Sequence, residues 1–191
     1  MEPYWAEAIY LLETLVLLAK RSDKDGMDLY FTIPEQRKSR DRPFKATLKG
    51  AKSESQFRKA MEEKDPRKGL WTATDMIAPI ENIFDEFLNP SEDQKHLKSM
   101  LKRPKKTQDA SKALTLLIFT NGTWGAMEDP DAINNCIEKL LKDLSARKLI
   151  GSAKKGFDRH VSIEFIQFGD DPTVTERLGA LDDGMEIKGY E

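Results

Sequence analysis

The chain has 191 residues, a length typical of one domain built around a single hydrophobic core. Its 31 basic and 33 acidic side chains leave a net charge of only −2, so no overall field favours nucleic acid or a membrane surface. The single cysteine, Cys136, excludes an internal disulfide framework, and nothing at the N-terminus resembles a signal peptide, so we expect a cytoplasmic protein.

The first third of the chain predicts a helix followed by two strands. Apolar residues recur at helical spacing over residues 5–19, a segment too short to cross a bilayer core of about 30 Å. Alternation of apolar and polar residues over 27–31 predicts a strand, and a short edge strand is expected at 44–48. Three further leucines widen the apolar face of the helix and agree with a buried contact there: Leu11, Leu17 and Leu18.

Two helices and a basic loop are expected in the middle of the chain. Ser53 and Gln56 have the spacing of a capping box, in which each side chain satisfies a backbone N–H at the start of a helix. Apolar residues over 76–88 predict a second helix, with Pro79 in its first turn, where a missing N–H costs little. The basic segment 95–112 lacks interleaved aromatic residues, so a solvated loop is favoured over a nucleic-acid patch.

Strands and helices alternate in the last third. The continuous apolar run 114–119 is typical of a parallel strand covered by helices on both faces. Asp129 and Pro130 are expected to open the next helix, and Cys136 lies on its apolar stripe, where a buried structural thiol is favoured over a nucleophile. Another strand is predicted at 161–168, and Asp171 with Pro172 should open a last helix.

This alternation predicts one α/β domain over residues 1–191, with a Rossmann-like, mostly parallel sheet and helices on both of its faces. Ligand sites in such sheets lie beyond the carboxyl ends of the strands, where Thr120, Asn121 and Gly122 stand. The chain has no glycine-rich nucleotide loop, and its two histidines, His96 and His160, lack the spacing of a zinc pair. We therefore expect no nucleotide cofactor.

Four phrases, spread over nearly the whole chain, carry a family resemblance: 23-DKDGMDLYF-31, 114-LTLLIFTNGTWG-125 with 129-DPDAI-133 after it, 163-IEFIQFGDDP-172 and 181-LDDG-184. In this order they resemble the von Willebrand factor A (vWA) domain, in particular its fungal intracellular branch. The resemblance implies a three-layer fold and a metal-ion-dependent adhesion site (MIDAS). In the family, an Asp-x-Ser-x-Ser motif, a threonine and an aspartate supply oxygen ligands that suit Mg²⁺.

Compared with the family, this sequence departs from the metal site at two of its three elements. The Asp-x-Ser-x-Ser motif and the strand before it are absent. The resemblance places Thr74 at the metal-linked threonine, with Thr72 as the fallback, and puts Asn121 where the family has an aspartate. A helix cap at Thr74 and a turn residue at Asn121 are the structural alternatives. We expect a degenerate and empty metal site, with Mg²⁺ as the ion it would take, and no cofactor.

The missing strand would lie between the strands at 27–31 and 114–119, according to the resemblance. Backbone groups left unpaired there cost about 1–3 kcal/mol each if they are buried. Three alternatives follow: the two neighbouring strands pair directly, another chain donates a strand, or the sequence is a truncated piece of a longer protein.

The leading interpretation is a non-catalytic protein–protein interaction module whose partner is another protein, or a second copy in a homo-oligomer, and not nucleic acid or a membrane. The alternative is a metal-dependent hydrolase or phosphoryl-transfer enzyme, which requires four acidic loop residues to converge. These residues are Glu128, Asp129, Asp170 and Asp171. A third hypothesis, nucleic-acid binding through residues 95–112, predicts salt-sensitive retention on a polyanion.

Overall fold

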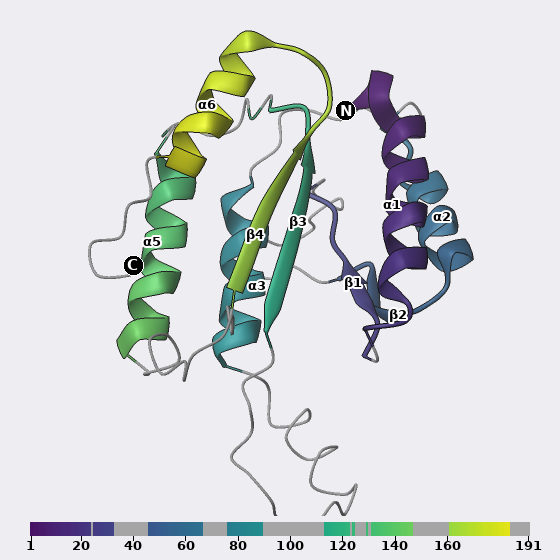
Figure 1. Ribbon diagram of the computed structural model, residues 1–191, viewed down its shortest axis with the longest axis horizontal. Coiled ribbons are helices and arrows are strands. Elements are labelled where there is room, and N and C mark those ends of the chain that lie inside the picture. The colour runs from purple at the N-terminus through teal and green to yellow at the C-terminus, as the bar shows by residue number, and fades with distance from the viewer. Residues whose placement is uncertain are drawn as a thin grey trace, which may run out of the picture.

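The computed structural model describes residues 1–23, 25–32, 46–66, 76–89, 113–122, 124, 129, 131–146 and 161–183. Within these residues the chain mixes helices with short sheets, one of them a parallel pair, which agrees with the α/β class in the prediction (Figure 1). A short 3-10 helix at Glu2–Tyr4 leads into the other elements, which are α1 (Trp5–Ala19), β1 (Met27–Leu29), β2 (Leu48–Ala51), α2 (Glu54–Glu63), α3 (Ile77–Leu88), β3 (Leu114–Thr120), α5 (Ala132–Ala146), β4 (Val161–Gln167) and α6 (Pro172–Asp183).

The first sheet is an antiparallel pair of β1 and β2, in which Met27 lies opposite Ala51. The edge strand expected at 44–48 is thus displaced toward the C-terminus and begins at Leu48. Two glycines with positive φ set this register, because a Cβ atom on Gly26 would lie 2.4 Å from the carbonyl oxygen of Gly50. The spacing of apolar residues contains no information about such a close approach of two backbones. The strand predicted at 44–48 was therefore wrong in its position.

The second sheet is a parallel pair of β3 and β4, in register from Leu114 opposite Val161 to Thr120 opposite Gln167. The strands predicted at 114–119 and 161–168 are therefore confirmed. Among the described residues β1 and β3 are not paired with each other, and the two pairs form separate sheets. Direct pairing of the two strands that flank the missing one, the first of the three alternatives, is therefore wrong.

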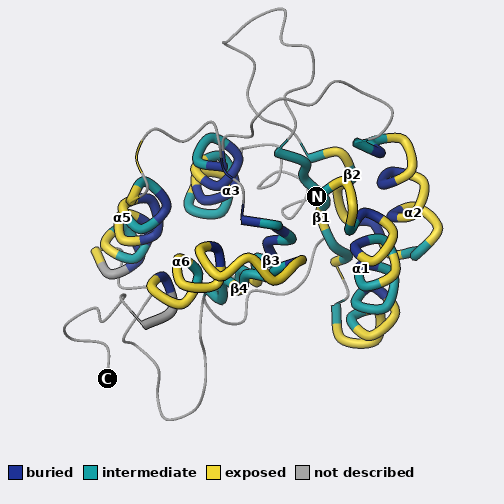
Figure 2. The backbone as a smooth tube through the Cα atoms, turned by 90° about the horizontal axis from the view of Figure 1, so that it is seen from above, coloured by how far each residue is buried: buried dark blue, intermediate teal, exposed yellow. Residues whose placement is uncertain are grey.

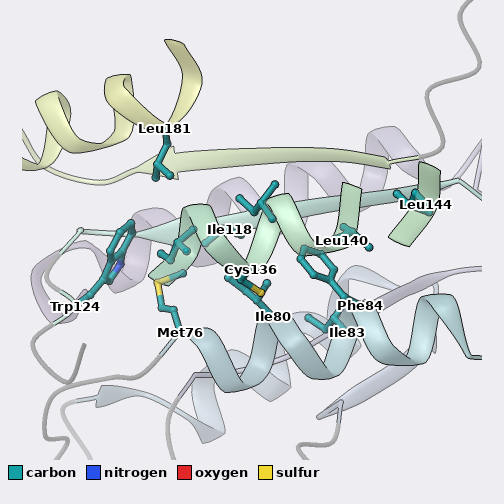
Figure 3. Packing of buried hydrophobic residues seen from close by; sticks show 12 residues of the cluster. Met76, Ile80, Ile83, Phe84, Ile118, Trp124, Cys136, Leu140, Leu144 and Leu181 are labelled. Carbon is teal, nitrogen blue, oxygen red and sulfur yellow. The ribbon is translucent and has the colours of Figure 1, made fainter. Parts of the chain in front are cut away.

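A hydrophobic cluster, called here the α3–α5 cluster, fills the space between α3, α5, α6 and one face of the β3–β4 pair. Figure 3 shows Ile80 and Phe84 of α3 beside Cys136 and Leu140 of α5. Side chains at alternate positions of both strands pack against this cluster, as expected for one face of a sheet. They are Leu114, Leu116, Ile118, Val161, Ile163 and Phe165.

A second cluster, called the α1–α2 cluster, joins α1 and α2 to the β1–β2 pair. Its centre includes Trp5, whose indole N–H donates to the Met61 carbonyl oxygen at 3.1 Å. Phe119 and Ile166, at positions of the opposite parity on β3 and β4, also pack against this cluster. Both sheets therefore contact the α1–α2 cluster, and each cluster lies on one face of β3 and β4.

The helix starts follow the predicted caps in two cases and depart from them in one. Ser53 and Gln56 form the expected capping box at the start of α2. Asp171 accepts a hydrogen bond from the backbone N–H of Thr173 at 2.9 Å, and Pro172 is the first residue of α6. The third helix, α5, begins only at Ala132, because Asp129 closes a turn before the helix and accepts from Asp131 N at 2.9 Å.

Burial along β3 is uneven, although a hydrophobic cluster lies on each face of the strand. Ile118 and Thr120 are the two buried residues of this strand, whereas Thr115 is exposed. No helix in the described part of the chain is long and apolar enough to span a membrane.

Candidate functional site

The loop after β3 begins with a buried hydroxyl that ends the apolar run. Thr120 is 4% exposed, and its Oγ1 accepts hydrogen bonds from Gly122 N at 2.8 Å and from the Trp124 indole N–H at 2.9 Å. Both bonds turn the chain sharply, so that Trp124 folds back into the α3–α5 cluster. The Thr120 hydroxyl thus stabilises the loop through hydrogen bonds to two residues of the loop itself.

Gly122 is fixed in this loop by its backbone and by α6. Its φ is +70°, a left-handed conformation that favours glycine. A Cβ atom at this position would lie 2.1 Å from Cγ1 of Val174, which is buried in α6. The loop therefore packs directly on the first turn of α6, at the carboxyl ends of both parallel strands.

Arg177 of α6 places a positive charge on this loop. Its Nη1 donates to the Gly122 carbonyl oxygen at 3.3 Å, and its Cζ lies 5.5 Å from the centre of the Trp124 ring. A guanidinium over an aromatic face is held by the ring quadrupole in addition to its hydrogen bond. The cation is part of the loop's surface, since the Arg177 side chain is itself exposed.

The loop after β4 lies beside the first loop and against the start of α1. Gly169 has φ +94°, and a Cβ atom there would lie 2.8 Å from the hydroxyl of Tyr4. Gln167 Nε2 donates to the Gly169 carbonyl oxygen at 3.2 Å and to Thr175 Oγ1 at 3.1 Å. The site is therefore assembled from three parts of the chain: the loop after β3, the loop after β4 with α6, and the N-terminal turn.

The acidic residues of the second loop have a structural role in part. The Thr173 side-chain hydroxyl and then its backbone N–H hold the pKa of Asp171 below its usual range, with a smaller contribution from Arg177. Such bonds to a carboxylate at the start of a helix are those of an N-cap. Asp171 is fully exposed, so its negative charge faces solvent.

The sequence-predicted site residues fall into two groups. Asn121 lies half-buried at the carboxyl end of β3, where it was expected, and the left-handed conformation belongs to its neighbour Gly122. Thr74, the fallback Thr72 and Glu128 lie outside the described residues, as do both histidines and the basic segment 95–112.

The acidic residues that the enzyme hypothesis requires are described in part. Asp129, Asp170 and Asp171 are all exposed. Among the described residues, no group of three or more histidine, cysteine, aspartate or glutamate side chains could hold a metal ion. The convergence needed for a metal-dependent hydrolase is therefore not seen in this part of the chain.

Sequence reasoning missed Arg177, Trp124 and Tyr4 as parts of the site. Arg177 stands on the exposed side of a helix 55 residues after Gly122, and nothing in the local pattern connects the two. Trp124 offered a weak signal, because an aromatic residue four positions after a strand end can return its indole N–H to that strand.

Comparisons of the chain with models of protein families, with curated proteins and with solved structures found no match.

Proposed function

We propose that the chain is a non-catalytic protein-interaction module of vWA type, with a degenerate metal site that binds no divalent ion. In this proposal the two strand pairs belong to the single sheet of a three-layer fold, and one strand position between β1 and β3 is open. The packing supports it: Met27 and Leu29 of β1 contact the α1–α2 cluster, as Phe119 of β3 does, whereas Tyr30 contacts the α3–α5 cluster. Strands of a single sheet share their two faces in this way.

The edge of β3 that faces away from β4 carries the proposal, because no strand in the described part of the chain pairs with it; it is called here the open edge of β3. Phe168 N donates to the Thr120 carbonyl oxygen at 2.8 Å, so Thr120 points its backbone groups at β4. Alternate residues of a strand point their N–H and C=O groups to opposite sides. Thr115, Leu117 and Phe119 therefore direct theirs away from β4, toward a side where no described strand pairs with β3. An extended segment of a partner protein satisfies these groups by strand addition.

The electrostatics of the loop after β3 support an empty metal site. A divalent ion there meets the neutral amide of Asn121 in place of a carboxylate, and hard cations depend on carboxylate ligands. Arg177 already brings a positive charge to the neighbouring Gly122 carbonyl. The Arg177 guanidinium repels a divalent ion at this loop, and it attracts an acidic group on a partner protein.

Strand addition is tested by selecting eight-residue peptides from a displayed library against the folded chain. We expect enrichment of peptides that are apolar at both odd and even positions, because a strand beside β3 faces the α1–α2 cluster on one side and the α3–α5 cluster on the other. The bound peptide should slow amide exchange at Leu117 and Phe119, the residues whose N–H groups point outward. Protection confined to other segments, or no enrichment, contradicts the proposal.

A matched pair of variants sharpens this test. Leu117→Pro removes the outward N–H and is compatible with an edge position, so it should weaken peptide binding about tenfold or more while the circular dichroism spectrum is retained. Leu117→Ala also loses the side chain but keeps the N–H, and it should bind more tightly than the proline variant.

The metal claim is tested separately by calorimetric titration with Mg²⁺ and Mn²⁺. We expect no saturable binding in the micromolar range, and the same trace for the wild type and for Asn121→Ala. Micromolar binding that disappears in Asn121→Ala would show that the amide is a ligand and that the site is functional.

A further inference from the structure

Helix α1 is apolar on two sides, and one of them faces solvent. The side that faces the α1–α2 cluster carries the buried residues Trp5, Ala8, Leu12 and Val16. The opposite side exposes Tyr10 by 74%, Leu17 by 53% and Leu18 by 70%. Among the described residues these are the large hydrophobic side chains that are exposed, and all three belong to this helix. The exposed positions of α1 are yellow in Figure 2.

Tyr10 and Leu17 belong to one line of residues along the helix, and Leu18 lies beside that line; these three side chains are called here the stripe. Glu7, Tyr10, Thr14, Leu17 and Arg21 follow one another at intervals of three and four residues, the spacing of the a and d positions of a coiled coil, although Glu7, Thr14 and Arg21 are polar. Thr14 lies at the centre, and its hydroxyl donates to the Tyr10 carbonyl oxygen at 2.9 Å. The hydroxyl is therefore satisfied within the helix and does not require water at the middle of the stripe.

The stripe has opposite charges at its two ends. Glu7 is exposed in the first turn of α1, and Arg21 is exposed in the turn that follows the helix. If a second copy lies antiparallel, with Thr14 opposite Thr14, Glu7 faces Arg21 and Tyr10 faces Leu18 at both ends. A parallel arrangement would instead place Glu7 against Glu7, and like charges repel.

The charges that flank the stripe are already engaged within the chain. Arg58 of α2 donates to Glu13 at 2.6 Å, and Lys20 lies 3.8 Å from Glu54. These contacts hold Glu13 and Lys20 toward α2, so Glu7 and Arg21 remain as the charges at the two ends of the apolar stripe.

We propose that two copies of this chain associate through α1, in an antiparallel and two-fold symmetric pair. The occupant of the stripe is the same stripe on a second molecule, because the pattern is complementary to itself in apolar side chains and in charge. A single 15-residue helix from each copy makes a small interface, so the dimer is of the weak, reversible class. This surface is separate from the open edge of β3, and the inference does not depend on the proposed vWA function.

Sedimentation equilibrium of the full chain, at concentrations from about 1 µM to about 1 mM, tests the proposal. We expect a reversible monomer–dimer equilibrium. Leu18→Lys should weaken the dimer about tenfold or more, because it places a charge opposite Tyr10 of the second copy. A chain that remains monomeric throughout, or forms only larger aggregates, overturns the proposal.

A charge exchange identifies the antiparallel register. Glu7→Arg gives a chain with two positive ends, and Arg21→Glu gives a chain with two negative ends, so each variant alone should dimerise more weakly than the wild type. An equimolar mixture of the two should recover association to the wild-type level, since every opposed pair is again of opposite sign. In a parallel pair each variant alone would instead associate as the wild type does, and the mixture would associate more tightly than the wild type. If the mixture associates no more tightly than the separate variants, the proposed register is wrong.

The control is Glu176→Arg, which makes the same charge change at an exposed position on α6. It should leave the dimer unchanged. Circular dichroism spectra of all variants verify that differences in association do not come from unfolding.

Discussion

Gly122 shows at the level of a single residue how the site depends on backbone shape. Replacement by alanine meets a φ of +70° and places a Cβ atom 2.1 Å from the Val174 side chain. We expect Gly122→Ala to lower the free energy of unfolding by about 2–4 kcal/mol, from backbone strain and overpacking together. Urea denaturation measures the loss.

A second glycine provides the matched control. Gly179 lies within α6, and a Cβ atom there would meet nothing within 4 Å. Gly179→Ala should stabilise the chain by about 0.5–1 kcal/mol, because alanine is the better helix former. Equal effects of the two substitutions would show that the loop does not pack on Val174.

Cys136 is expected to be an unreactive thiol in the folded chain. Burial, with a smaller effect of Glu81, raises its pKa to about 11 from an ordinary value of 9.0. At pH 8 the thiolate population is then roughly 100-fold lower than for an unperturbed cysteine, so a thiol reagent should label the native chain that much more slowly than the unfolded chain. Equal rates in buffer and in urea would contradict this.

The same thiol makes stability depend on alkaline pH. Because the folded pKa is the higher one, its contribution to stability is complete below about pH 9 and is lost as the pH rises toward about 11. Cys136→Ala should lack this component, so the difference in unfolding free energy between the two proteins should change across that window and stay constant below it.

Asn121 and Arg177 mark the limit of what sequence indicates at the residue scale. The end of an apolar run followed by Asn-Gly places Asn121 at the rim of the sheet, because the polarity change is local. Arg177 reaches the same loop only through the packing of α6 on Gly122, a contact between residues far apart in the chain. Local patterns carry no information about such a contact.

Among the elements, α2 has the start that the sequence indicates most clearly. Gln56 N donates to Ser53 Oγ at 3.4 Å, and Ser53 N donates to Gln56 Oε1 at 3.3 Å. Ser53→Ala leaves these groups without their reciprocal partner and should destabilise the chain by about 1 kcal/mol. Ser53→Thr, which keeps a capping hydroxyl, is the control and should stay within about 0.5 kcal/mol in thermal or chemical denaturation.

The sequence predicts well those elements whose bounds depend on residues within the element. It does not predict the bounds of elements that depend on contacts with other segments. The helices α2, α3 and α6 and the strands β3 and β4 carry their periodicity and caps in contiguous sequence. The position of β2 depends on the approach of Gly50 to Gly26, and the start of α5 depends on a turn closed by Asp129. Pairing and turn geometry decided these two cases, and single-segment patterns do not encode them.

At the scale of the whole molecule, the α/β class follows from the alternation of elements, but the joining of sheets does not. The parallel pair has the register expected for neighbouring strands of an open sheet. The two pairs remain separate among the described residues, although both contact the α1–α2 cluster. Strand order is set by packing between segments far apart in the sequence. The sequence of a segment therefore predicts that it forms a strand more reliably than it predicts which strand pairs with it.

The two clusters also give the molecule a pair of optical reporters. Trp5 is buried in the α1–α2 cluster and Trp124 in the α3–α5 cluster, and each indole N–H has a distinct acceptor, Met61 O or Thr120 Oγ1. After Trp71→Phe, emission from Trp124 alone or Trp5 alone, obtained by a second Trp→Phe change, follows one half of the molecule. Coincident emission transitions during denaturation would mean that both halves melt as a single cooperative unit, and staggered ones would reveal which half yields first.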